Sequence, residues 1–142
     1  MGKKRIVKSS GEGAGSKPTS LSRVPRKKVL SGTLYVESTY NNTKGLLTDT
    51  SGNALVWSSS GMLGFRGAKK GTPFAAAKVG ELIGEKAASM GMKEAGAVIK
   101  GVGSGREATV RGFMSKGIDI ISIKDATPVP HNGPKAKKPR RV

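Results

Sequence analysis

Positive charge is concentrated at the two ends of this chain, and that distribution limits which residues can fold. Residues 1–30 hold nine Lys or Arg and one acidic residue, and residues 125–142 hold five and one. Residues 1–30 have too few apolar side chains to offset the entropy of ordering their backbone. Residues 1–30 are predicted to form a disordered basic arm, and residues 125–142, with four prolines, an extended basic arm. The folded domain is left to residues 31–124.

The net charge points to the kind of partner. The 142 residues include 26 Lys and Arg against 9 Asp and Glu, a formal charge of +17. This excess predicts a polyanion, RNA or DNA, in preference to an anionic membrane. The chain has no cysteine, and a lone His131 cannot form a zinc or haem site by itself. We therefore expect no cofactor and no metal. Because no apolar run approaches the ~20 residues that span a bilayer, we also expect a soluble cytoplasmic protein.

Residue patterns between the arms predict an α/β domain with the order βββαβαβ. Strands are expected at residues 33–40, 43–48, 54–59, 95–100 and 118–123. Helices are expected from Thr72-Pro73 to Gly91 and over residues 105–116. The last two strands should be parallel, because right-handed crossovers connect them.

Several local features carry further predictions. Gly80 and Gly84, inside the first helix, should allow close approach of its backbone to the sheet. Ser104 and Glu107 have the spacing of a capping box. The apolar strand 118–123 is expected to be covered on both faces. Several of the six aromatic side chains are expected in the core.

The stretch KGVGSGRE, residues 100–107, places three glycines between a strand and a helix. Gly101, Gly103 and Gly105 could bring backbone amides and a helix N-terminus to a phosphate. The alternative is a turn that binds nothing, and the flanking Lys100 and Arg106 favour phosphate contact. A dinucleotide site is excluded because Arg106 stands where its third glycine is needed, and the chain contains no P-loop.

A second basic loop spans residues 61–71. Arg66 can bind phosphate through two parallel hydrogen bonds, and Lys69 and Lys70 add point charges. Phe65 could stack on a base, but we favour a role as an anchor of the loop on the core.

Two other functions would use parts of this pattern. A nuclease would need carboxylates converging on two cations, and Glu37 could be combined with Glu81 or Glu85. The fourth strand contributes no carboxylate, and His131 lies in a proline-rich tail rather than on a scaffold for Ser/His/Asp catalysis. A DNA-compacting protein would account for the charge equally well.

Four strings, in this order, resemble the bacterial form of the small-subunit ribosomal protein S-eleven family: NNTKGLLTDTSGNALVWSSSG, LGFRGAKKGTPFAA, KGVGSGREATVRGF and DATPVPHNGPKAKKPRRV. The resemblance covers residues 32–142. It implies a ribonuclease-H-like fold without catalytic carboxylates, and therefore no enzyme. It also implies binding to 16S ribosomal RNA on the platform, near the messenger RNA exit path and beside the seventh and eighteenth small-subunit proteins. The source could be bacterial or organellar.

By the same likeness, RNA contacts are expected in four places. They are Asn41, Asn42 and Thr43; Arg66, Lys69 and Lys70; Lys100, Gly101, Gly103, Gly105 and Arg106; and His131, Asn132, Lys135, Lys137, Lys138, Arg140 and Arg141. The chain departs from the family at Val102 and Ser104, which replace prolines, and at Pro134, where cysteine is common. The glycine loop should therefore be less rigid before binding.

Overall fold

The computed structural model describes residues 28–141, whose backbone forms five strands and two α-helices in the predicted order. The strands are β1 (Ser31–Ser38), β2 (Thr43–Asp49), β3 (Ala54–Ser59), β4 (Glu94–Gly101) and β5 (Asp119–Asp125). The helices are α1 (Pro73–Ser89) and α2 (Gly105–Met114), and a short 3₁₀ helix, η2 (Gly67–Gly71), precedes α1. The predicted mixed α/β fold is confirmed.

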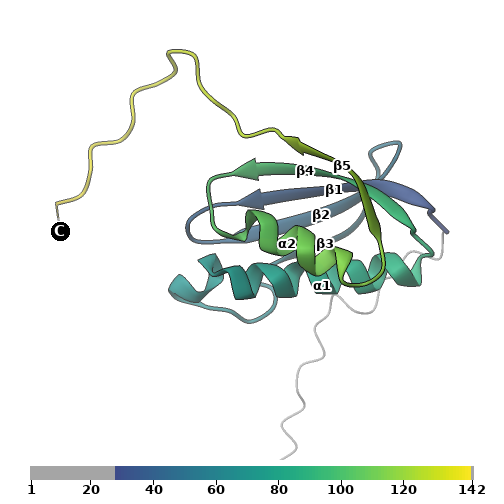
Figure 1. Cartoon of the computed structure of the whole chain (residues 1–142). Coiled ribbons are helices and arrows are strands. Elements are labelled where there is room, and N and C mark those ends of the chain that lie inside the picture. Colours follow the sequence, from purple (N-terminus) through teal and green to yellow (C-terminus); the bar gives the residue numbers. More distant parts are fainter. Residues whose placement is uncertain (1–27, 142) are drawn as a thin grey trace, which may run out of the picture.

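The strands form one sheet in the order β3-β2-β1-β4-β5 (Figure 1). The pairs β1–β2 and β2–β3 are antiparallel, whereas β1–β4 and β4–β5 are parallel. The turn between β1 and β2 is closed by local hydrogen bonds: the Thr39 amide donates to the Asn42 carbonyl at 2.8 Å, and the Asn42 amide donates to the Thr39 hydroxyl at 3.1 Å. Helix α1 leads into β4, which pairs with β1, and helix α2 connects β4 to β5.

Both helices cover the same face of the sheet, and the other face is bare (Figure 1). Alternation along β1 shows this directly, because Leu34 and Val36 are buried while Tyr35 and Glu37 are exposed. The core lies between sheet and helices, and its largest fully buried side chain is Phe113 of α2. The molecule is therefore a two-layer sandwich.

The two helices touch through glycines. A Cβ on Gly80 of α1 would lie 2.1 Å from the Thr109 carbonyl oxygen, and one on Gly112 of α2 would lie 2.4 Å from the Ala77 carbonyl oxygen. The expectation that Gly80 and Gly84 approach the sheet is wrong, because both face α2. Val79 and Ile83 contribute the buried side chains that α1 places in the core.

Strand β5 differs from its prediction. It lies at the edge of the sheet, with Ile121 and Ile123 about two-thirds exposed, so it is not covered on both faces. Both helices pack mainly on the other strands of the sheet. An apolar run alone does not reveal whether its strand is central or at an edge.

The aromatic side chains also depart from expectation. Phe113 is fully buried, but Tyr35, Tyr40, Trp57 and Phe74 are each at least 43% exposed. The core is filled by aliphatic residues instead, including Leu34, Leu47 and Ile83. Four exposed rings on one small domain are available for contacts outside it.

The ends of the described region differ from each other. Val29 is buried against the core and its amide donates to the Met90 carbonyl at 3.2 Å, so the folded body begins before β1. Residues 1–27, which hold most of the predicted N-terminal arm, lie outside the described residues. Residues 128–141 are exposed and form neither helix nor strand. Within residues 28–141, neither helix combines the length and apolar character that a membrane crossing requires.

Candidate nucleic-acid interface

Three loops meet where β1 and β4 end. Because these strands are parallel and Ser38 pairs with Gly101, the β1–β2 turn and the β4–α2 loop leave the sheet side by side. The segment before α1 packs onto the same turn. We call residues 39–42, 61–72 and 101–104 together the loop edge, which Figure 1 shows at one end of the sheet.

Glycines allow these loops to pack closely. A Cβ added to Gly71 would lie 2.1 Å from the Tyr40 carbonyl oxygen. One added to Gly103 would lie 2.2 Å from the Thr39 carbonyl oxygen, and one added to Gly101 would lie 2.1 Å from the Ser38 carbonyl oxygen. Gly101 also has a φ of 103°, which side-chain-bearing residues rarely adopt. The predicted RNA residues Gly101 and Gly103 therefore have a packing role of their own.

Two amides of the glycine loop are bonded within the protein. The Gly103 amide donates to the Ser38 carbonyl at 2.9 Å, and the Gly101 amide donates to the Thr127 hydroxyl at 3.3 Å. Gly105, the first residue of α2, is buried against the Thr43 hydroxyl.

Both helices start at this edge, where their positive dipole ends favour an anion. In α1, however, Pro73 has no amide hydrogen and the Ala75 amide donates to the Thr72 hydroxyl, so α2 offers more first-turn amides than α1.

The predicted capping box is wrong. Ser104 has helical backbone angles and makes no side-chain cap; its hydroxyl donates instead to the Gly71 carbonyl at 2.9 Å. Glu107 pairs with Arg111 at 3.5 Å. The Ser104 bond joins two parts of the loop edge, and this tertiary contact replaces the local one.

The basic residues of the 61–72 loop face solvent in front of α1. Arg66 and Lys69 are exposed and Lys70 is half-buried, and none of the ion pairs among residues 28–141 involves them. Lys69 and Lys70 form the last turn of η2, and Thr72 caps α1 by accepting a hydrogen bond from the Ala75 amide at 3.3 Å. Lys69 and Lys70 therefore lie beside the N-terminus of α1, the positive end of its dipole.

An aromatic pair borders this loop, and only one of its two rings was expected there. Phe65 packs edge-to-face on Phe74, with ring centroids 6.0 Å apart, and the Lys78 ammonium lies 5.6 Å from the centre of the Phe74 ring. Phe65 thus anchors its loop on α1 through Phe74, a ring that is 63% exposed, and not on the core as the favoured interpretation expected. Phe74 directly follows Pro73 at the start of α1, and this position beside the basic loop is the feature of the sequence that could have indicated its role.

The three predicted residues of the β1–β2 turn differ in access. Asn41 is exposed, and Asn42 is half-buried with a buried side-chain oxygen that has no hydrogen-bond partner within the described residues. Thr43 is fully buried and lies 3.3 Å from the Ser38 hydroxyl, so it supports the turn from inside. Tyr40, which no pattern singled out, is 78% exposed at the tip.

Arg106 ties the glycine loop to the start of the C-terminal arm. Its guanidinium donates to the Asp125 carboxylate at 2.7 Å, to the Thr127 hydroxyl at 3.1 Å and to the Gly101 carbonyl. Hydrogen bonds from the Thr127 hydroxyl and amide, with the Arg106 contact, hold the pKa of Asp125 well below its ordinary value. We call Arg106, Asp125 and Thr127 the arm latch.

The arm itself leaves from the loop edge. Strand β5 runs parallel to β4, so both end at the same side, and residues 128–141 extend away from the body (Figure 1). The arm's predicted RNA residues are all exposed, and Asn132 has a positive φ of 56°. They are His131, Asn132, Lys135, Lys137, Lys138, Arg140 and Arg141.

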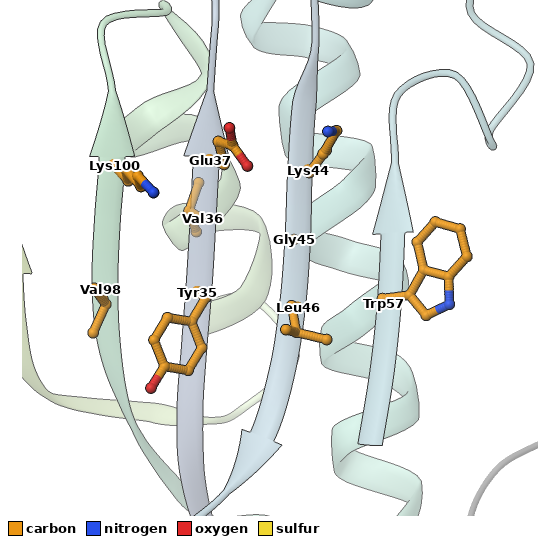
Figure 2. Close-up of a pocket in the computed structure, with 9 residues that line it drawn as sticks. All are labelled: Tyr35, Val36, Glu37, Lys44, Gly45, Leu46, Trp57, Val98 and Lys100. Carbon is orange, nitrogen blue, oxygen red and sulfur yellow. The ribbon is translucent and has the colours of Figure 1, made fainter. Parts of the chain in front are cut away.

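The geometry separates the carboxylates that a nuclease would need. Glu37 lies on the bare face of the sheet between Lys44 and Lys100 (Figure 2), whereas Glu81 and Glu85 belong to α1 on the opposite face. They cannot converge on a shared pair of cations. Among residues 28–141, no cluster of three or more His, Asp or Glu side chains could hold a metal ion.

Residues 32–141 match the sequence model of the family described as ribosomal protein S11. The matched region includes the loop edge, both helices, the arm latch and the C-terminal arm as far as Arg141.

Proposed function

This chain belongs to the ribosomal protein S11 family and is thus a small-subunit ribosomal protein, and on that premise we propose that it binds 16S ribosomal RNA through its loop edge and C-terminal arm. In this role it is a structural component of the subunit that supports assembly. It transforms no substrate.

One observation carries this proposal: the loop edge, two helix N-termini and the root of the basic arm all lie at the same side of the sheet. Arg66, Lys69 and Lys70 stand there without an ion pair among residues 28–141. Cations and unpaired helix amides bind phosphate oxygens. An RNA backbone passing this edge would therefore meet both kinds of donor.

The arm has a different role from the folded body. The body fixes orientation, and the arm follows RNA grooves and neutralises phosphates. Because A-form grooves expose little base information to side chains, RNA shape and backbone dominate the contact. With about six phosphate contacts, affinity should fall about 10³-fold between about 50 and 200 mM salt.

The finer placement follows from the family. We propose that the protein is of the bacterial type, lies in cytoplasmic ribosomes on the platform near the messenger RNA exit path, and neighbours the seventh and eighteenth small-subunit proteins. The support is the family match together with the string HNGPKAKKPRR in the arm.

Washing purified small subunits with increasing salt tests the binding proposal. The protein should remain in the subunit pellet at low salt and be released over a defined range as phosphate contacts are screened. A protein that is found free in lysate, apart from ribonucleoprotein, would contradict it.

Two assays address the other functions. Sustained RNA cleavage with Mg²⁺ that is abolished by Glu37→Gln would favour a nuclease. At equal salt, preference for duplex DNA over folded 16S RNA would favour a DNA-compacting protein. We expect neither result.

A further inference from the structure

The face of the sheet opposite the helices carries an ordered row of side chains that the proposed contacts do not use. Cross-strand pairing places Trp57 of β3 beside Leu46 of β2, Leu46 beside Tyr35 of β1, Tyr35 beside Val98 of β4, and Val98 beside Lys124 of β5. Trp57 is 59% exposed and Tyr35 is 43% exposed. We call this surface the open face.

A second row lies next to the first, toward the loop edge. Glu37 pairs in register with Lys44 on one side and with Lys100 on the other, as Figure 2 shows. None of the ion pairs among residues 28–141 involves these three side chains. With the aromatic row they line a groove of about 390 Å³.

From these rows we infer that the open face binds a short single-stranded RNA segment, whose bases stack on Tyr35 and Trp57 while Lys44, Lys100 and Lys124 bind its phosphates. The two aromatic residues stand two strands apart, about 10 Å, so one or two nucleotides bridge them. Aromatic residues on a bare sheet are how several RNA-binding folds hold unpaired bases.

The charges of the open face favour RNA over a partner protein. Three lysines and one glutamate surround four apolar side chains, and the centre of a protein interface is depleted in lysine and glutamate. A polyanion with flat bases complements both the cations and the rings. Glu37 can only accept hydrogen bonds, so it suits the N–H groups on the edge of a base.

This surface is distinct from the loop edge and does not depend on it. Trp57 is the chain's single tryptophan, so its emission reports on the open face directly. A single-stranded hexanucleotide should quench Trp57 fluorescence in the full-length protein, in about 0.5 M salt to screen the arms. Tyr35→Leu should weaken the binding about tenfold or more, the usual effect of removing one stacking ring.

Leu30→Ala is the matched control, because Leu30 is 66% exposed and lies outside the open face. It should leave the quenching unchanged. Trp57→Phe keeps a ring, so a labelled hexanucleotide should bind it more tightly than Trp57→Leu. Both variants change an exposed side chain, and thermal unfolding confirms their fold.

Three results would overturn the inference. In the first, the labelled hexanucleotide binds but Trp57 is not quenched, or is quenched equally in Tyr35→Leu. In the second, the emission depends on protein concentration without RNA, which assigns the face to a second copy. In the third, a photo-crosslinker at position 35 in assembled subunits reaches a protein instead of RNA. The salt-wash test of the loop edge is unaffected by any of them.

Discussion

The Arg106 guanidinium donates a hydrogen bond to the Asp125 carboxylate at 2.7 Å, and this contact joins the first turn of α2 to the last residue of β5. Arg106 lies in the glycine loop's sequence motif, which predicts that it binds phosphate. In the structure it positions the root of the arm beside that loop. Its side chain remains 29% exposed, so an arriving phosphate could compete with Asp125 for it.

The arm latch should respond to acid. The ordinary carboxyl pKa of 3.8 is lowered in the folded protein by the hydrogen bonds from Thr127 and Arg106. A lowered pKa means that the latch is favoured at any pH above the ordinary value and is lost as pH falls through the folded value. An NMR titration should therefore find the Asp125 carboxyl still ionised at a pH near its ordinary pKa of 3.8. Protonation of Asp125 near its ordinary pKa of 3.8 would show that the latch does not form in solution.

Close contact between the helices should make Gly80 intolerant of any side chain. In Gly80→Ala the new methyl would lie 2.1 Å from the Thr109 carbonyl oxygen, which belongs to backbone and cannot rotate away. We expect the free energy of unfolding to fall by about 1–3 kcal/mol, as for other overpacked sites, even though alanine favours helix by about 1 kcal/mol. Urea denaturation measures the change.

Gly61→Ala is the control for that substitution. The nearest atom to a Cβ at Gly61 is 3.8 Å away, and its φ is not in the left-handed region. Its effect should stay within about 0.5 kcal/mol. Equal decreases in the two variants would mean that the approach of the helices does not set the cost.

The sequence predicted the order of elements well because that order depends on local patterns. β-Branched and aromatic residues predict β1, and Thr72-Pro73 with Gly91 predict the ends of α1, and these signals do not depend on tertiary neighbours. The predictions were wrong where a residue distant in the sequence determines the contact. The Ser104 hydroxyl bonds to Gly71 in another loop, and Gly80 faces α2 rather than the sheet.

The candidate site could be predicted only in part, for the same reason. Cations in a glycine-rich loop are visible in the sequence, so Arg66, Lys69 and Lys70 can be picked out without coordinates. Thr43 is predicted with the turn asparagines but is buried, since alternation along β2 turns it inward. The aromatic row of the open face is not visible in the sequence, because exposure depends on which sheet face the helices cover.

The loop lysines should contribute to RNA binding mainly through charge. Replacing both Lys69 and Lys70 with alanine should weaken binding to 16S RNA at low salt. It should also reduce the slope of log K against log salt by about 0.7–0.9 for each phosphate that is no longer neutralised. Filter binding over a range of salt concentrations gives the slope. An unchanged slope would mean that these lysines do not bind RNA phosphates.

Lys93→Ala serves as the control for charge alone. Lys93 is exposed and directly precedes β4, so it lies at the end of the sheet opposite the loop edge. The substitution removes one positive charge from the same body without touching the proposed surface. We expect a slope close to that of the unmodified protein.

The C-terminal arm should affect binding but not folding. Residues 129–141 are exposed and form neither helix nor strand, while the latch residues Asp125 and Thr127 hold the root. Truncation after Pro128 removes five Lys and Arg and should strongly weaken incorporation into small subunits. The circular dichroism spectrum and the unfolding temperature should stay the same, because the core and the latch are left intact. A lower unfolding temperature would mean that the arm supports the fold.

A second variant separates charge from chain length in the arm. Replacing Lys135, Lys137, Lys138, Arg140 and Arg141 with glutamine keeps every backbone amide. If phosphate neutralisation is the arm's role, this variant should bind as weakly as the truncation and show about the same reduced salt dependence, because counterion release scales with the number of phosphates neutralised. Binding near the normal level would instead assign the arm's contribution to His131, Asn132 and the backbone, and so to RNA shape.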